Sequence, residues 1–184
     1  MQSLRIDTLP TPNPDAMMFK VEVPLVERGT FEFNAPEKAG NSALPKRLFA
    51  IDGVDQVLVT SRFVTVNKTT ELPWHDLVSN IKGAIRAHLA SGDPAVEDQP
   101  ELTALVTDSE LARQIVELID EEVRPALAQD GGDVQFVGLT AENVVQLRLI
   151  GACSSCPSSS ATLAFGIERL LVEEFPDIQG VVQV

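Results

Sequence analysis

Cysteine is almost absent from this 184-residue chain. The only two, Cys153 and Cys156, lie three positions apart in the stretch GACSSCPSSS. Disulfides are rare in reducing compartments, and a bridge between such near neighbours would close too short a loop to restrain the unfolded chain. The scarcity argues against a disulfide-stabilised scaffold and indicates a chemical role for the pair.

Long apolar runs are also missing. No stretch approaches the roughly eighteen apolar residues of a transmembrane helix. The start, MQSLRIDTLPTPNPD, has neither the basic and then apolar pattern of a secretory signal nor the Arg-rich, acid-poor composition of a transit peptide. We therefore expect a cytoplasmic protein, in the first place a bacterial one. The alternative is a mitochondrial or plastid protein whose leader has been removed.

Lysine is absent from the second half of the chain. Residues 91–184 contain four arginines and seventeen acidic residues, so this half carries the whole net charge of −13. Phosphate backbones and anionic membranes would repel it, which argues against nucleic acid and membrane partners. The acids are typical of a solvated face that keeps a protein soluble, with a basic docking partner as the alternative.

The apolar pattern divides the chain into two small α+β domains. Residues 1–90 form the first domain, and residues 91–108, with glycine, prolines and acids but little periodicity, are typical of an extended linker. Within the first domain, period-two alternation predicts strands and a period near four predicts helices. The expected strands lie in 3–9, 19–23, 29–34, 54–61 and 63–68, and the expected helices in 42–53 and 72–92.

Residues 109–184 predict a second domain with the order helix, strand, strand, helix, strand. Its three strands should form one sheet with the helices on one face. Pro125 lies inside the first helical pattern and should interrupt its last turns, and Gly131 and Gly132 should end that helix. The expected helices lie in 108–130 and 157–175, and the expected strands in 133–140, 143–151 and 178–184.

The cysteine pair lies between a predicted strand and a predicted helix, and it fits three kinds of site. A Cys-x-x-Cys at a helix start is the arrangement of thiol–disulfide oxidoreductases. Against that function, serines separate the two cysteines, a proline follows them, and the βαβ order of such enzymes is missing. Pro157 suits the first position of a helix, so both cysteines should lie near the helix N-terminus. The positive end of the helix dipole there should lower the pKa values of their thiols.

A structural zinc site needs four ligands, and the chain offers few candidates besides the cysteines. His75 and His88 are the only histidines; both lie in the first domain and lack the spacing of a metal pair. We expect each to be a surface or packed side chain. Zinc would therefore require two chains.

An iron–sulfur cluster shared across a twofold axis is the third possibility. Two chains would each contribute Cys153 and Cys156, which completes the four thiolates of a [4Fe–4S] cluster. A cluster at such an interface would be exposed and labile, which suits a carrier. Spacing alone does not decide between the redox, zinc and cluster sites.

Longer stretches carry a resemblance to a known family. The second domain resembles the NifU-like domain of the Nfu iron–sulfur proteins in DGGDV at 130–134, GACSSCPSS at 151–159 and TLAFGIERLL at 162–171. The first domain resembles the Nfu N-terminal domain in TPNPDAMMF at 11–19 and in the stretch 44–68. The chain lacks the further cysteine-rich modules of NifU itself.

The resemblance implies a function for the pair. It implies a non-enzymatic scaffold or carrier in which Cys153 and Cys156 ligate a [4Fe–4S] cluster shared with a second protomer. The partners would be an upstream cluster donor and apo-proteins that receive the cluster. By elimination, the first domain should contact donor or client proteins. Gly131, Gly132, Asp130 and Asp133 are expected to be turn and cap residues.

Overall fold

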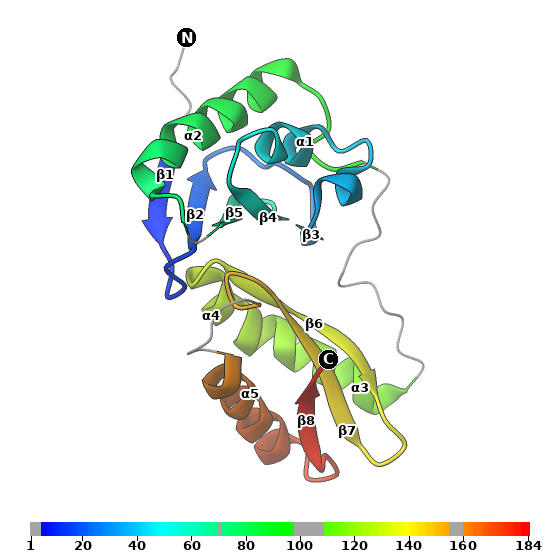
Figure 1. Cartoon of the computed structure of the whole chain (residues 1–184). Coiled ribbons are helices and arrows are strands. Elements are labelled where there is room, and N and C mark those ends of the chain that lie inside the picture. Colours follow the sequence, from blue (N-terminus) through cyan, green and yellow to red (C-terminus); the bar gives the residue numbers. More distant parts are fainter. Residues whose placement is uncertain (1–4, 70, 98–108, 155–159) are drawn as a thin grey trace.

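The computed structural model describes residues 5–69, 71–97, 109–154 and 160–184. These form two α+β domains that pack against each other, with the N-terminal domain above the C-terminal domain in Figure 1. The predicted α+β class is confirmed, and each domain has its own sheet and its own apolar core. Within the described residues, no helix is long and apolar enough to cross a membrane.

The N-terminal domain contains one five-stranded antiparallel sheet. Its strand order is β1-β2-β5-β4-β3, so the hairpin predicted from residues 54–68 supplies β4 and β5, two of the three inner strands. The short strand β3 forms one edge and β1 the other. The strands are β1 (Ile6–Pro10), β2 (Ala16–Val21), β3 (Phe31–Phe33), β4 (Val54–Val59) and β5 (Phe63–Lys68).

Two helices cover one face of this sheet, α1 (Ala43–Phe49) and α2 (Trp74–Ser91). Helix α2 begins after Pro73 and ends at Gly92, whose φ of 73° is left-handed, and it lies within the predicted range 72–92. A short 3-10 helix, Pro36–Ala39, precedes α1 and was not predicted. The core between sheet and helices includes Phe19, Phe33, Leu48, Val57, Val64, Ile81 and Ile85.

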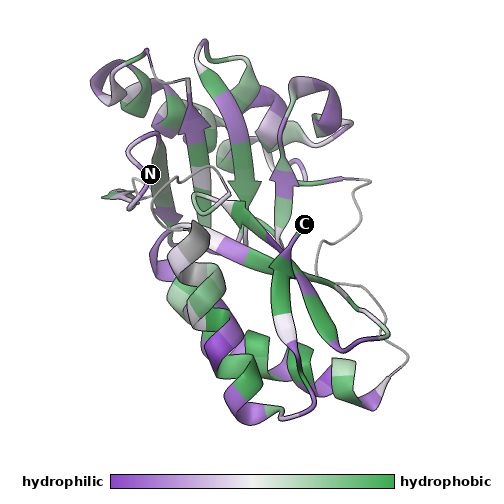
Figure 2. Ribbon diagram, turned by 60° about the horizontal axis from the view of Figure 1, so that its bottom comes forward, coloured by the Kyte–Doolittle hydropathy of each residue, from purple (hydrophilic) through white to green (hydrophobic). Residues whose placement is uncertain are grey.

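The sheet is buried on both faces, although alternation in its strands predicted one solvated face. Along β5, Val64 and Val66 face the helices, whereas Phe63, Thr65 and Asn67 face the C-terminal domain, and all five are buried. Figure 2 shows that the strands contain both hydrophobic and hydrophilic residues. The neighbouring domain, rather than water, covers the more polar face.

The first helix of the C-terminal domain is interrupted, as Pro125 predicts. Helix α3 (Glu110–Leu118) is capped by Ser109, whose hydroxyl accepts from the Ala112 N–H. A π-helical segment, η2 (Ile119–Val123), then leads into α4 (Arg124–Gln129). Proline lacks an N–H group, so Pro125 cannot donate a helical hydrogen bond. The wider π turn before it accommodates this missing bond, and within it the Arg124 N–H donates to Ile119 O.

Three strands and α5 complete this domain. The sheet order is β6-β7-β8, with β6 (Gly132–Leu139) antiparallel and β8 (Gly180–Gln183) parallel to β7 (Val144–Gly151). Helix α5 (Ser160–Glu174) supplies the crossover between the parallel strands. Helices α3, α4 and α5 all contribute to one core with Val134, Phe136, Val145, Leu147 and Leu149, so they lie on one sheet face, as predicted.

The predicted linker, residues 91–108, falls partly outside the described residues, which stop at 97 and resume at 109. Its first part packs on the N-terminal domain. Ala95 is buried in that core and its carbonyl accepts from Leu44 N–H, while Ser42 and Glu97 exchange two hydrogen bonds.

Candidate functional site at the cysteine loop

The loop after β7 carries Cys153. Gly151 ends the strand with a φ of 70°, a left-handed conformation that turns the chain away from the sheet. The N–H and the hydroxyl of Ser154 both donate to Gly151 O, at 3.2 and 2.8 Å. These bonds close a tight turn around Cys153, and they depend on a residue that tolerates a positive φ.

Cys153 is buried, with 3 % of its surface exposed, and belongs to the C-terminal core. Its Sγ lies against the backbone of Gly132, where a Cβ atom would overlap the sulfur. Thiolate sulfur is a preferred ligand of iron–sulfur clusters, so the donor type fits such a cargo. The burial means that the sulfur must become accessible before it can bind a metal shared with another chain.

Cys156, the second predicted ligand, lies outside the described residues, together with Pro157. Within the residues the structure does describe, no three His, Cys, Asp or Glu side chains gather into a metal-binding group. The assignment of Cys153 and Cys156 as a ligand pair therefore remains a prediction.

A second glycine turn lies beside the cysteine loop. Gly131 has a φ of 75° and separates α4 from β6, the role predicted for the Asp130–Gly132 stretch. Gly132 pairs with Gly151 at the end of the β6–β7 ladder, and the Ala152 N–H donates to Gly131 O at 3.2 Å. The two turns therefore form one unit at the end of the sheet that faces the N-terminal domain.

Residues of the N-terminal domain hydrogen-bond directly to both turns. Thr65 Oγ1 donates to Gly131 O at 2.7 Å, and Asn13 Nδ2 donates to Ala152 O at 3.1 Å. The carbonyl that precedes Cys153 is thus held by a side chain more than a hundred residues away in sequence. The Cys153 loop is consequently a site built from both domains.

Glu32 of β3 is the acidic member of this site. Its Oε1 accepts the Gly151 N–H at 2.8 Å and a bond from Gln56 Nε2. Burial raises the pKa of the Glu32 carboxyl above its ordinary value, against the opposing effects of the Gly151 N–H, the Arg148 charge and Gln56. The Ser154 hydroxyl shares its single hydrogen between Gly151 O at 2.8 Å and Gln56 Oε1 at 3.3 Å, so the network reaches past Cys153.

The other sequence candidates lie away from the loop. His75 is exposed on the first turn of α2, and His88 is buried near the end of the same helix. Each has the packing or surface position expected for it. Asp133, expected to be a cap, does accept the Val134 N–H, but it also bonds Thr30 across the domain boundary.

The sequence did not identify the N-terminal residues of this site. Asn13 lies in the TPNPD stretch, which carries part of the family resemblance, but the sequence assigned no role to this residue. Glu32, Thr65 and Asn67 occupy the polar positions of alternating strands, and such positions normally face water. Their burial depends on domain packing, for which period-two alternation carries no signal.

Comparison with known proteins assigns both domains. The model of the NifU-like domain matches residues 115–182, which include the whole cysteine loop. The model described as scaffold protein Nfu/NifU N terminal matches residues 6–92, which include β1 to β5, α1 and α2. Both halves of the site therefore lie in matched regions.

Curated relatives match nearly the whole chain. NifU-like protein 5, mitochondrial, of Arabidopsis thaliana is 39 % identical over 99 % of this chain and 68 % of its own length. The human NFU1 iron-sulfur cluster scaffold homolog, mitochondrial, is 41 % identical over 97 % of this chain and 71 % of its own length. NifU-like protein C1709.19c of Schizosaccharomyces pombe is 34 % identical over 100 % of this chain and 74 % of its own length.

Two of these relatives are named as mitochondrial, so the names give no support to the prediction of a bacterial cytoplasmic protein. The similarity to these relatives extends over 97 % or more of this chain, and the two matched regions together span residues 6–182. The chain is therefore a member of the Nfu family, with an Nfu N-terminal domain joined to a NifU-like C-terminal domain.

Proposed function

We propose that this protein is an iron–sulfur cluster scaffold that binds a labile [4Fe–4S] cluster between two protomers and passes it to apo-proteins. The observation that carries the proposal is the position of the chain's only two cysteines, Cys153 and Cys156, within the NifU-like region. The name of the human relative, an iron–sulfur cluster scaffold homolog, supports the same function. Each chain would provide two thiolates, and a homodimer would complete the set of four.

Transfer would proceed by exchange of thiolates. A client cysteine loses its proton and forms a new iron–sulfur bond, while the bond from iron to Cys153 or Cys156 breaks and the released thiolate takes up a proton. No electron is gained or lost in this exchange. The function requires neither a catalytic acid nor a catalytic base, so we propose a carrier rather than an enzyme.

The partners follow from the direction of transfer. An upstream assembly protein would donate the cluster, and proteins that lack their cluster would receive it. The mitochondrial names of two relatives favour the predicted alternative of a location in an organelle. The bacterial cytoplasm stays a prediction that only the source of the chain can test.

The test is anaerobic reconstitution of the full chain with iron and sulfide, followed by gel filtration. We expect about two irons and two sulfides per chain, a peak of doubled mass and broad absorption near ~400 nm. Cys153→Ser and Cys156→Ser should each abolish cluster retention, whereas Ser91→Ala, remote in sequence from the loop, should load like the wild type.

Other outcomes would point to other chemistry. A colourless, iron-free monomer that reduces a model disulfide would contradict the scaffold and favour a thiol–disulfide oxidoreductase that uses the same pair. A colourless dimer that retains zinc without sulfide would favour a zinc site.

A further inference from the structure

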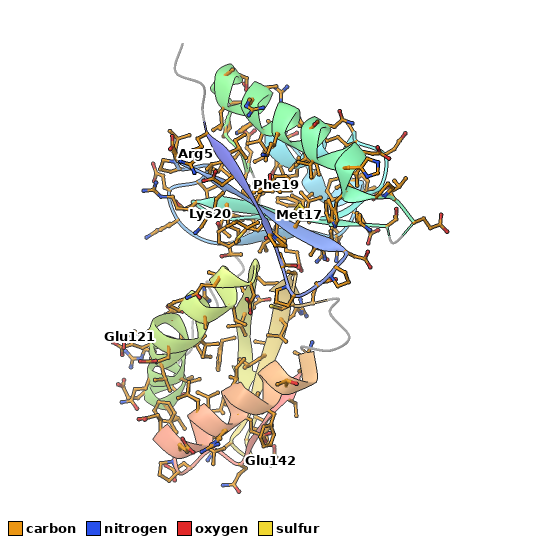
Figure 3. All side chains as sticks on the ribbon, turned by 90° about the vertical axis from the view of Figure 1, so that its left-hand side faces the viewer. Arg5, Met17, Phe19, Lys20, Glu121 and Glu142 are labelled. Carbon is orange, nitrogen blue, oxygen red and sulfur yellow. The ribbon has the colours of Figure 1, made fainter. Side chains whose placement is uncertain are left out.

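The N-terminal sheet has a second face, opposite α1 and α2, which we call the interdomain face. Its polar members are Glu32, Gln56, Thr65 and Asn67, one or two from each of β3, β4 and β5. Its apolar members Met18, Leu58 and Phe63 form a small core with Ile150 of β7. Figure 3 shows α4 and the ends of β6 and β7 reaching this face.

The polar members bind backbone atoms of the two glycine turns. Asn67 Nδ2 lies 3.5 Å from Gly151 O, and Glu32 Oε1 accepts the Gly151 N–H. Thr65 holds Gly131 O in the neighbouring turn. Both backbone polar groups of the residue that ends β7 therefore have side-chain partners in the other domain. Backbone recognition of this kind fits one loop conformation and does not depend on exposed side chains.

Ala152, the residue after Gly151, is held by the segment 11–16. The sequence singled out this segment by its family resemblance but assigned it no role. Asn13 is buried and donates from Nδ2 to Ala152 O. Its Oδ1 accepts the Asp15 N–H at 3.0 Å, and its own N–H donates to Thr11 Oγ1 at 3.2 Å. The segment is thus folded so that the Asn13 amide points at the cysteine loop.

Gly131 and Gly151 allow the C-terminal domain to approach the N-terminal domain closely. A Cβ atom on Gly151 would lie 2.6 Å from Leu58 Cδ2, and one on Gly131 would lie 3.0 Å from Thr11 Cγ2. Both contacts are to the N-terminal domain. The absence of a side chain at Gly131 and Gly151 therefore allows both the left-handed turns and the close packing against the interdomain face.

We propose that the interdomain face is a binding site for the cysteine loop, and that docking there competes with pairing of two cysteine loops around a cluster. Two loops that share one cluster must meet with their sulfur atoms exposed. The docked loop is instead bonded to the N-terminal domain at Gly151, Ala152 and Ser154, and these bonds hold the conformation in which Cys153 Sγ lies against Gly132 and only 3 % of Cys153 is exposed. The docked chain is the cluster-free form, and the domains separate when the loop takes up a cluster. The competition with a cluster rests on the function proposed above.

The first experiment uses the cluster-free full chain and measures alkylation of Cys153 by iodoacetamide, followed by peptide mass spectrometry. The test variant combines Asn13→Asp with Thr65→Val. Asn13→Asp keeps the acceptor for Asp15 N–H but replaces the donor to Ala152 O by a carboxylate oxygen, and Thr65→Val replaces the hydroxyl that binds Gly131 O by a methyl. Loss of two hydrogen bonds should speed alkylation of Cys153 about tenfold.

The matched control is Thr8→Val on β1. Thr8 alternates with the interdomain residue Leu9, and its hydroxyl has no partner within the described part of the chain. In the control, Cys153 should be alkylated at the wild-type rate. Thr65→Ser keeps a hydroxyl at position 65, so Cys153 should be alkylated in this variant at a rate close to that of the wild type. Alkylation that is equally slow in the test variant and the wild type would overturn the proposal, provided that both remain folded by circular dichroism.

The second experiment separates this inference from the proposed function. Hydrogen exchange of the Gly151 amide, which bonds Glu32, reports docking directly. We expect the amide to exchange faster in the reconstituted chain than in the cluster-free chain. Iron and sulfide uptake with no change in Gly151 exchange would overturn the competition but leave the scaffold function intact. Failure of uptake would contradict the scaffold function, while the alkylation result would still decide whether the face binds the loop.

Discussion

Lys68 Nζ lies 2.8 Å from Asp15 Oδ1 and 5.6 Å from the centre of the Trp74 ring. The ammonium thus joins the end of β5 to the segment that contains Asn13, and Trp74 holds the same segment through Pro14 O. Only 6 % of the Lys68 side chain is exposed, so water screens this ion pair weakly. The contacts explain how a proline-rich segment keeps one conformation beside the cysteine loop.

Lys68→Met should destabilise the N-terminal domain by about 1–3 kcal/mol, because it leaves the partly buried Asp15 carboxylate without its ion pair and removes the cation over Trp74. Urea unfolding followed by the fluorescence of Trp74, the only tryptophan, would measure the change. Arg5→Met removes the exposed ion pair with Asp7 and should change the stability little. Equal midpoints for the two variants would contradict this assignment.

Gly132→Ala should destabilise the C-terminal domain by about 1–3 kcal/mol through overpacking. The new methyl would overlap Cys153 Sγ and lie 3.1 Å from Ile150 O, and Gly132 does not have a positive φ that would add backbone strain. Gly166→Ala in α5 is the control, because its Cβ would meet nothing within 4 Å, and a helical alanine should be neutral or stabilising. Thermal unfolding by calorimetry would measure both, and a Gly132→Ala midpoint at or above the wild type would be the contrary result.

Thr30→Val should weaken the contact between the domains. Thr30 Oγ1 donates to Asp133 Oδ2 at 2.6 Å, and the Asp133 side chain is buried between the Val134 N–H and Arg124. Loss of one bond to a buried carboxylate should cost about 1–3 kcal/mol in urea unfolding followed by circular dichroism. Thr30→Ser keeps the hydroxyl and should recover most of the loss; a valine variant as stable as the serine variant would show that the bond contributes nothing.

His88→Leu should make the protein less sensitive to mild acid. Burial is the main cause that lowers the pKa of His88 below its ordinary value of 6.5, and the Arg47 charge acts in the same direction. The unfolded chain therefore binds a proton as the pH falls through 6.5 while the folded chain does not, so this contribution to stability is present above that pH and lost below it. Midpoints of thermal unfolding from pH 7.5 to pH 5.5 should fall less in His88→Leu than in the wild type.

The control for that comparison is His75→Gln, which changes the other histidine of the same helix at an exposed position. Its midpoints should follow the wild type across the same pH range. A parallel fall in all three proteins would assign the acid sensitivity to carboxyl groups instead of His88.

Local chemistry predicted much of the fold. Pro125 interrupts a helix and Gly131 ends it where the sequence indicates, because proline lacks a donor and glycine tolerates a positive φ. The 3-10 helix at Pro36–Ala39 was missed because so short an element has no period to detect.

The candidate site was predicted only in part. Cys153 was identified because cysteine is rare and the residue type carries its own chemistry. Asn13, Glu32 and Thr65 carry no such signal, since asparagine in a turn and polar residues in a strand are ordinary surface features. Their role depends on the packing of one domain against another, which is set by contacts between residues such as Leu58 and Ile150 that lie far apart in the chain.

The parallel pairing of β7 and β8 has a practical consequence for affinity tags. Both strands run in the same direction, and the Val184 N–H donates to Leu147 O, four residues before Gly151. Residues appended after Val184 would extend along β7 toward the cysteine loop, which begins about 13 Å further on at the strand rise of roughly 3.3 Å per residue. A purification tag that contains histidines, themselves metal ligands, belongs at the other end of the chain whenever iron uptake is to be measured.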